Sequence, residues 1–201
     1  MKQKIDLRNV KTCVFGIQGS GKTYLVSNNL LKNFKAPFIY EIHPEDFRHV
    51  PRALIYAYKP ENLEIEKLNR VCKDVKYLAQ KGDIDAFVLD EADMFIQSTL
   101  SIPTHLRDLI LNHRHYGLAL IFISRRPQSI PTEIVESCEH MFVFQIEGEN
   151  VERKLKSIHP DFETLIKDVS KQKHNFIYKK IGAPPVVYDA IKSKKKQKTK
   201  K

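Results

Sequence analysis

The strongest constraint on the fold of this 201-residue chain is a cluster of glycines between a predicted strand and a predicted helix. Residues 16–23 read GIQGSGKT, so three of the chain's seven glycines fall within six positions. The preceding residues, 12–16, are typical of a short strand, and residues 22–33 are typical of a helix. A glycine-rich turn in this place can wrap its backbone N–H groups around phosphates, and the positive end of the helix adds to the attraction. The pattern G-x-x-x-x-G-K-[ST] therefore predicts that a nucleotide is held by Gly16, Ile17, Gln18, Gly19, Ser20, Gly21, Lys22 and Thr23.

Short apolar strands alternate with helices along the rest of the chain. Strands are predicted over residues 37–42, 53–58, 86–89, 118–124 and 141–145, and helices over residues 65–79, 104–115 and 131–137. Continuous apolar strands separated by helices indicate a mostly parallel sheet that is covered on both faces. The segment 175–189 is predicted to add a hairpin at the edge. We therefore expect one three-layer α/β domain over residues 1–191.

A second candidate for phosphate chemistry is the acidic pair at the end of the apolar strand 86–89. Asp90 is expected at the carboxyl end of that strand, where ligands bind in open α/β sheets. Together with the Thr23 hydroxyl, it is predicted to hold Mg²⁺, while Lys22 reaches the β- and γ-phosphates. The adjacent Glu91 is predicted to act as the general base that activates water. Asp93 is expected to begin a short helix instead.

The order of these motifs resembles the large ATPase class, RecA-like or ASCE, that inserts a strand between the phosphate loop and the acidic strand. A more specific resemblance lies in residues 106–144, LRDLILNHRHYGLALIFISRRPQSIPTEIVESCEHMFVF. This run resembles the HerA/FtsK superfamily of DNA-pumping ATPases, in particular the small genome-packaging ATPases of viruses with internal membranes. The zonular occludens toxin family of filamentous-phage assembly ATPases is the next most similar. The guanine-specificity signature N-K-x-D is absent, which favours ATP over GTP.

The resemblance also implies a ring and an interface site. Family members form rings, usually hexamers, in which an arginine of the neighbouring subunit completes the ATP site; the candidates here are Arg107, Arg114, Arg125 and Arg126. Where the family usually carries a glutamine that senses the γ-phosphate, this chain reads Ser124-Arg125. The resemblance therefore implies that either Ser124 or Arg125 senses the γ-phosphate in this chain.

The distribution of charged, apolar and cysteine residues narrows the kinds of segment and site that this chain can form. The net charge is +10, and seven of those charges are lysines within residues 192–201, a run expected to be a disordered tail. Such a tail is either a solubilising end or a sequence-independent tether for phosphate backbones. The longest apolar run has six residues, Leu118–Ile123, whereas a membrane-spanning helix needs about 20. Three widely spaced cysteines argue against a disulfide framework and against a zinc site.

Three hypotheses of function follow from these features. The first is an ATP- and Mg²⁺-dependent ring that translocates double-stranded DNA into a viral capsid, with a capsid or membrane-protein partner and a location in the host cytoplasm or the virion. The second is a filamentous-phage assembly ATPase like the zonular occludens toxin family. The third is a nucleotide-binding regulatory or kinase-like protein without a DNA substrate; Glu91 argues against it, because a base of that kind favours water as the nucleophile.

Overall fold

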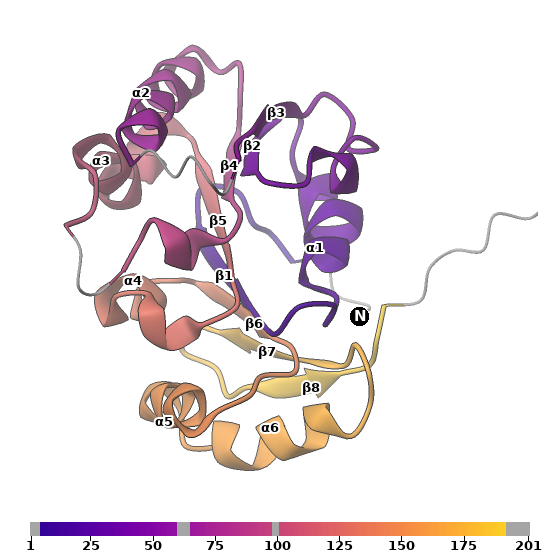
Figure 1. Cartoon of the computed structure of the whole chain (residues 1–201). Helices are drawn as coiled ribbons and strands as arrows, with labels where there is room; N and C mark the ends of the chain where they lie inside the picture. Colours follow the sequence, from indigo (N-terminus) through magenta and orange to yellow (C-terminus); the bar gives the residue numbers. More distant parts are fainter. Residues whose placement is uncertain (1–4, 60–64, 98–100, 192–201) are drawn as a thin grey trace, which may run out of the picture.

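The computed structural model describes residues 5–59, 65–97 and 101–191, and its centre is a single eight-stranded sheet (Figure 1). The strand order is β3-β2-β4-β5-β1-β6-β7-β8. The first six strands in this order are parallel, and the last two are antiparallel additions. The strands are β1 (Lys11–Phe15), β2 (Pro37–Glu41), β3 (Leu54–Ala57), β4 (Ala86–Leu89), β5 (Ala119–Ser124), β6 (His140–Val143), β7 (Phe176–Lys180) and β8 (Val186–Tyr188). The predicted mostly parallel α/β fold is confirmed, as is the terminal hairpin.

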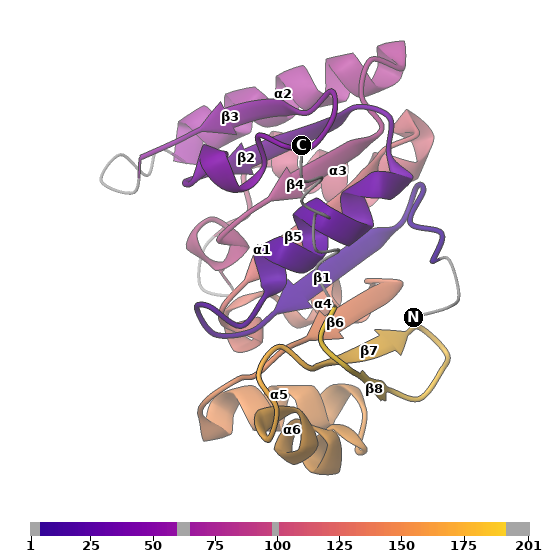
Figure 2. The ribbon, with the colours of Figure 1, turned by 90° about the vertical axis from the view of Figure 1, so that its right-hand side faces the viewer.

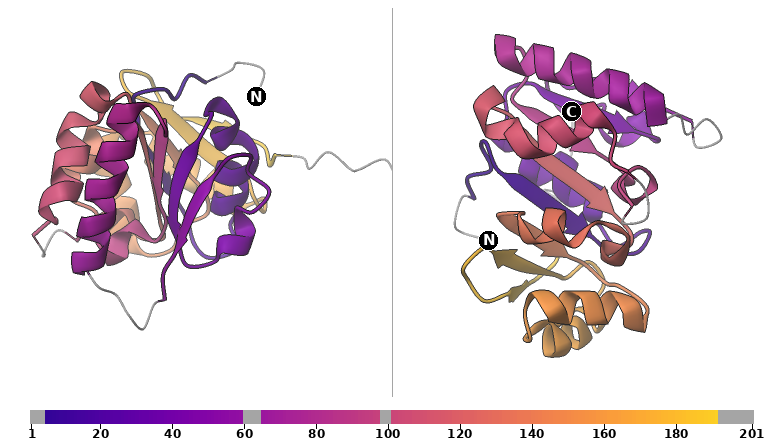
Figure 3. Two further views of the ribbon diagram at one scale, coloured as in Figure 1. Left: turned by 90° about the horizontal axis from the view of Figure 1, so that it is seen from above. Right: turned by 90° about the vertical axis from the view of Figure 1, so that its left-hand side faces the viewer.

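Helices cover both faces of the sheet. One face is covered by α1 (Lys22–Leu25) and its continuation, which runs in front of the strands in Figure 2. The opposite face carries α2 (Ile65–Lys81), α3 (Thr104–Asn112), α4 (Thr132–Glu136) and α5 (Glu149–Ile158), which the right-hand view of Figure 3 shows side by side, with α6 (Phe162–Ser170) next to α5. The molecule therefore has the three layers predicted from the sequence.

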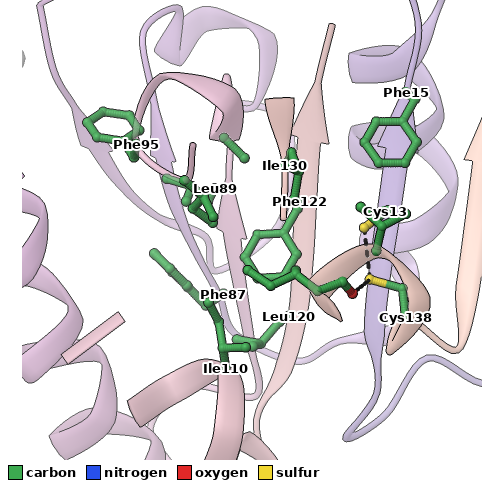
Figure 4. Packing of buried hydrophobic residues seen from close by; sticks show 14 of the residues in the cluster. Cys13, Phe15, Phe87, Leu89, Phe95, Ile110, Leu120, Phe122, Ile130 and Cys138 are labelled. Atoms are coloured by element: carbon green, nitrogen blue, oxygen red, sulfur yellow. Dashed lines mark hydrogen bonds between the residues drawn. The ribbon is translucent and has the colours of Figure 1, made fainter. Parts of the chain in front are cut away.

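Each face of the sheet has its own hydrophobic core. Strand residues alternate between the two cores, so that Phe87 and Phe122 pack toward α2 and α3 (Figure 4), whereas Val88 and Ile121 pack toward α1. Both β4 and β5 are buried along their whole length. Burying a large apolar side chain stabilises the fold by about 1.5–3 kcal/mol. These two strands therefore form a rigid base for the residues that follow them.

The helices differ from the prediction in three places. The helix expected over residues 22–33 is α-helical only to Leu25, then π-helical over Val26–Leu30 and 3-10 over Leu31–Asn33. The helix expected over residues 104–115 ends as α3 at Asn112 and continues as a 3-10 turn. The pair α5 and α6 was not predicted at all, although its buried residues follow helical spacing (Val151 and Leu155, then Phe162, Ile166 and Val169).

The parallel topology brings the ends of several strands to one edge. Because β5 lies between β1 and β4, the residues after β5 stand between loop 16–23 and the Asp90-Glu91 pair. The lysine-rich segment 192–201 lies outside the described residues, so the domain boundary at residue 191 remains a prediction. None of the helices in the described ranges is long and apolar enough to cross a lipid bilayer.

Candidate nucleotide-binding site

Loop 16–23 leaves β1 by a path that requires glycine. A Cβ atom on Gly16 would lie 2.7 Å from the Cβ of Phe144 and 2.7 Å from the Oγ of Ser20, closer than real Cβ contacts. Gly21 precedes α1 with a φ of 109°, a left-handed conformation that other residues rarely adopt. Gly16 thus provides the close approach to β6 and Gly21 the turn into the helix. The backbone of the loop has the form that the motif predicts.

The Lys22 side chain folds back over the loop. Its Nζ donates hydrogen bonds to the carbonyl oxygens of Gly16 at 2.7 Å and Ile17 at 3.0 Å, and the residue is only 8% exposed. Burial lowers the pKa of Lys22, while the charges of Glu91 and Asp90 oppose that shift. The ammonium group is therefore held inside the loop by two carbonyl hydrogen bonds, which an anionic ligand can replace.

Two carboxyl groups meet at the ends of β2 and β4. Asp90 accepts a hydrogen bond from the backbone N–H of Glu91 at 2.9 Å, and its own N–H donates to the carbonyl of Tyr40 at 3.0 Å. Glu41, the last residue of β2, is fully buried beside it. Burial, with a hydrogen bond and the charge of Asp90, raises the pKa of Glu41 to about 9. The raised pKa favours the protonated form of Glu41, which lies beside the Asp90 carboxyl group.

Glu41 is a site residue that the sequence reading missed. The signal was present, because a lone acid ends the apolar segment PFIYE. Its meaning depends on β2 lying beside β4, which only the sheet order shows. A buried tyrosine, Tyr58, also contacts Asp90: its hydroxyl donates a hydrogen bond to the Asp90 backbone carbonyl at 3.4 Å.

Glu91 and Arg125 form an ion pair. The Nε and Nη2 atoms of Arg125 donate to one carboxylate oxygen of Glu91 at 2.9 and 2.7 Å. Burial raises the pKa of Glu91, and the hydrogen bonds from Arg125 lower it. Glu91 also has a φ of 47°, unusual for a residue with a side chain and typical of strain kept at functional sites. The predicted general base is therefore held by an arginine of its own chain.

Two cavities flank the loop, each of about 310 Å³. The polar cavity is lined by Gln18, Gly19, Gly21, Lys22, Thr23, Tyr24, His43, Asp46, Asp90, Glu91 and Arg125. The apolar cavity is lined by Gly21, Tyr24, Leu25, Phe144, His174, Ala190 and Ile191. Gly21 and Tyr24 border both, so the two cavities are neighbours across the start of α1. His43, Asp46, Phe144, His174 and Ile191 were not predicted as site residues.

The polar cavity has the chemistry of a Mg²⁺–phosphate site. Thr23 and Asp90 line it together and supply a hydroxyl and a carboxylate, both oxygen donors. Within the described residues no group of three or more His, Cys, Asp or Glu side chains forms a metal cage. Mg²⁺ usually takes only one or two carboxylates, with phosphate and water completing its shell. The residues present therefore fit Mg²⁺ that arrives with a phosphate ligand.

The remaining predicted residues lie around this centre at different depths. Ser124 is fully buried, and its hydroxyl accepts a hydrogen bond from the backbone N–H of Arg126 at 3.0 Å. Arg114 is ion-paired with Glu139. Arg107 and Arg126 are exposed and make no ion pair with any residue in the described ranges. Among the four candidate arginines, Arg125 alone lines the polar cavity.

Comparisons with known proteins agree with this geometry at the level of the fold. No family model matches the chain, and no curated protein matches its sequence. The genome-packaging NTPase B204 of Sulfolobus turreted icosahedral virus 2, solved in complex with ATP-gammaS, has a similar structure: the TM-score is 0.75 at 16% identity, over 91% of this chain and 98% of that chain. The conjugation coupling protein TcpA of pCW3 has a TM-score of 0.64 at 15% identity, over 92% of this chain and 61% of TcpA.

Fold and motif together define the chain as a P-loop NTPase. The cytoplasmic domain of the type VII secretion ATPase EccC of Thermomonospora curvata has a TM-score of 0.60 at 13% identity, but only 25% of that chain is covered. The fold of these neighbours is consistent with the HerA/FtsK resemblance predicted from residues 106–144. For the viral packaging NTPase, the similarity covers nearly the whole of the solved chain.

Proposed function

We propose that the chain is an Mg²⁺-dependent ATPase that moves double-stranded DNA, and that its role is to package a viral genome. The observation that carries the proposal is the convergence of Lys22, Asp90, Glu91 and Arg125 on one cavity beside loop 16–23. These groups follow three different strands. Together they offer the phosphate-binding, metal-binding and charge-stabilising side chains that ATP hydrolysis needs. The DNA role is supported by the similar fold of the viral packaging NTPase, 98% of which this chain covers.

In this proposal ATP lies across the start of α1. The triphosphate occupies the polar cavity, and the adenine base enters the apolar cavity between Tyr24, Phe144 and Ile191. Lys22 leaves the two loop carbonyls and binds the β- and γ-phosphates. Thr23 and Asp90 would hold Mg²⁺, which would supply positive charge at the phosphates.

Hydrolysis then depends on breaking the pair between Arg125 and Glu91. The γ-phosphate carries more negative charge than one carboxylate, so it attracts the Arg125 guanidinium away from Glu91. The freed Glu91 accepts a proton from water while the water oxygen attacks the γ-phosphorus and ADP leaves. Arg125 stabilises the charge on the transferred phosphoryl group. The chain would thereby keep its base inactive until ATP is bound.

We further propose a ring in which a second arginine comes from the neighbouring subunit. Arg107 and Arg126 are the favoured candidates, because Arg114 is already paired with Glu139 and Arg125 with Glu91. Arg107→Ala and Arg126→Ala proteins should each be inactive alone if they supply this group. Mixed with Glu91→Gln protein, the correct variant should recover activity, because some interfaces then carry both intact residues. Failure of both to recover in exchanging rings would exclude them.

The DNA role is tested by ATP hydrolysis on size-fractionated protein with and without double-stranded DNA. We expect stimulation by the duplex, loss of turnover in Glu91→Gln, and full turnover in the exposed control Glu66→Gln. Hydrolysis that DNA leaves unchanged would contradict translocation and favour the regulatory or kinase-like hypothesis. Presence of the protein in packaging intermediates, and not in extruding filaments, would separate packaging from phage assembly.

The lysines of residues 192–201 are proposed to bind DNA phosphates without reading sequence. Each contact releases counterions, at roughly 0.9 per phosphate on duplex DNA. Deleting residues 192–201 should flatten the log–log salt dependence of DNA binding by about 2–4, since a terminal run uses only some of its seven lysines at once. Equal slopes for both proteins would assign the tail to solubility alone.

A further inference from the structure

Two cysteines that are far apart in sequence meet in the core. Cys13 lies in β1 and is fully buried, and Cys138 lies between α4 and β6 and is 6% exposed. Both thiols are free in this structure, and their Sγ atoms are 2.8 Å apart in a hydrogen bond that Figure 4 marks with a dashed line. The spacing of the cysteines along the chain gave no sign of this pair, because it depends on β6 lying beside β1.

The surroundings of the two thiols favour a bond between them over other uses. The pair lies among Phe15, Phe122 and Ile130 in the core on the α2–α3 face (Figure 4). In the folded protein this packing keeps large reactants in solution away from the two thiols. The Cys138 thiol also donates to the carbonyl of Ile134 at 3.3 Å. No third His, Cys, Asp or Glu joins them in a metal-binding group within the described residues.

We propose that Cys13 and Cys138 form an intramolecular disulfide. The two thiols lose two protons and two electrons to a small-molecule disulfide such as oxidised glutathione. One S–S bond forms between the Sγ atoms while one breaks in the oxidant, which leaves as two thiol molecules. Burial raises the pKa of the Cys13 thiol well above its usual range, so the thiols of the folded protein react slowly. We therefore expect the disulfide to form during folding, before the two thiols are buried.

The bond would anchor the strand that leads into loop 16–23. Cys13 is three residues before Gly16, and Cys138 stands just before β6, whose extension meets the same loop: the Ile17 N–H donates to the Gln145 carbonyl at 2.9 Å. The disulfide would close a loop of more than a hundred residues, which strongly restricts the unfolded chain. This inference is independent of the proposed function, since it concerns stability and not ATP.

The first test counts thiols in the full chain. The protein is refolded in a mixture of reduced and oxidised glutathione, quenched, and alkylated in denaturant without reductant. We expect one alkylated cysteine, Cys72, which is buried in α2 without a sulfur partner among the described residues, and a Cys13–Cys138 peptide by mass spectrometry. Three alkylated cysteines, or a bond to Cys72 or to a second chain, would overturn the proposal.

The second test compares melting temperatures with and without reductant. Reduction should lower the Tm of the wild-type protein and of the matched control Cys72→Ala by about 5–15 °C. Cys138→Ala should melt at the same temperature in both conditions. A reductant effect that persists in Cys138→Ala, or is absent from the wild-type protein, would show that no such bond stabilises the fold.

Discussion

The two cavities beside loop 16–23 are of equal size but are built in opposite ways. The polar cavity is formed by residues that follow β1, β2, β4 and β5, with charged groups in direct contact such as Glu91 and Arg125. The apolar cavity combines the start of α1 with Phe144 and with His174 and Ile191 from the C-terminal part of the chain. The polar cavity therefore offers a ligand charged groups, and the apolar cavity offers it apolar contacts.

The difference has a physical consequence for the two sides. Charges inside a partly buried cavity interact strongly, so a change of one group in the polar cavity alters its neighbours' protonation and position. Apolar contacts are short-ranged and roughly proportional to buried area, so their loss weakens binding without altering chemistry. We therefore expect substitutions in the polar cavity to change turnover, and those in the apolar cavity to change affinity.

The largest effect is expected for Glu91→Gln. An amide cannot accept the proton of the attacking water, so kcat should fall by about 100- to 10,000-fold while ATP still binds. Lys22→Ala should lose both ATP binding and turnover. The measurements are steady-state hydrolysis and equilibrium nucleotide binding. Wild-type turnover in Glu91→Gln would show that another group is the base.

Arg125→Gln should give the next largest effect and shows whether this arginine acts on Glu91. We expect kcat to fall by about 10- to 1,000-fold through loss of charge at the phosphoryl group. Since Arg125 lowers the pKa of Glu91, its removal should raise that pKa and shift the acidic limb of the pH–rate profile to higher pH. Arg70→Gln, a change of an exposed arginine in α2, is the control and should leave that limb in place.

Glu41 provides a pH test of the buried carboxyl group that lies beside Asp90. Its pKa is raised from about 4.5 to about 9, so the folded protein binds this proton more tightly than the unfolded chain. Stability from this group is complete at pH below about 4.5 and falls as pH rises toward 9, by up to about 1.4 kcal/mol per pH unit.

The measurement is the free energy of unfolding in urea at pH 5, 7 and 9. Glu41→Gln should gain stability relative to the wild-type protein as pH rises, because glutamine has no proton to lose. Glu45→Gln, an exposed position nearby, is the control and should follow the wild-type curve. Parallel curves for Glu41→Gln and the wild-type protein would mean that Glu41 is ionised in the folded state.

The smallest effect is expected in the apolar cavity. Ile191→Ser should raise the Kd for ATP by about threefold to tenfold, corresponding to about 1 kcal/mol of lost apolar contact, and leave kcat at saturation unchanged. Leu111→Ser, a change of an exposed leucine far from loop 16–23 in sequence, is the control. A fall in kcat equal to the rise in Kd would contradict the division of roles between the two cavities.

Much of the fold and the polar cavity could be predicted from local sequence. The glycines of loop 16–23 and the apolar strand before Asp90 carry their own signals, because backbone geometry and burial restrict which residues fit there. The alternation of apolar strands and helices identified the layers and the parallel sheet. Helices α5 and α6 were missed although their spacing was regular, so this omission was not forced by the sequence.

The contacts that the sequence could not indicate are those that depend on strand order. Glu41 faces Asp90 because β2 lies beside β4, Arg125 reaches Glu91 because β5 lies between β1 and β4, and Cys13 meets Cys138 because β6 lies beside β1. Local propensity determines where strands begin and end. Which strands become neighbours is decided by packing of the whole chain around two cores, so only the tertiary structure shows these pairs.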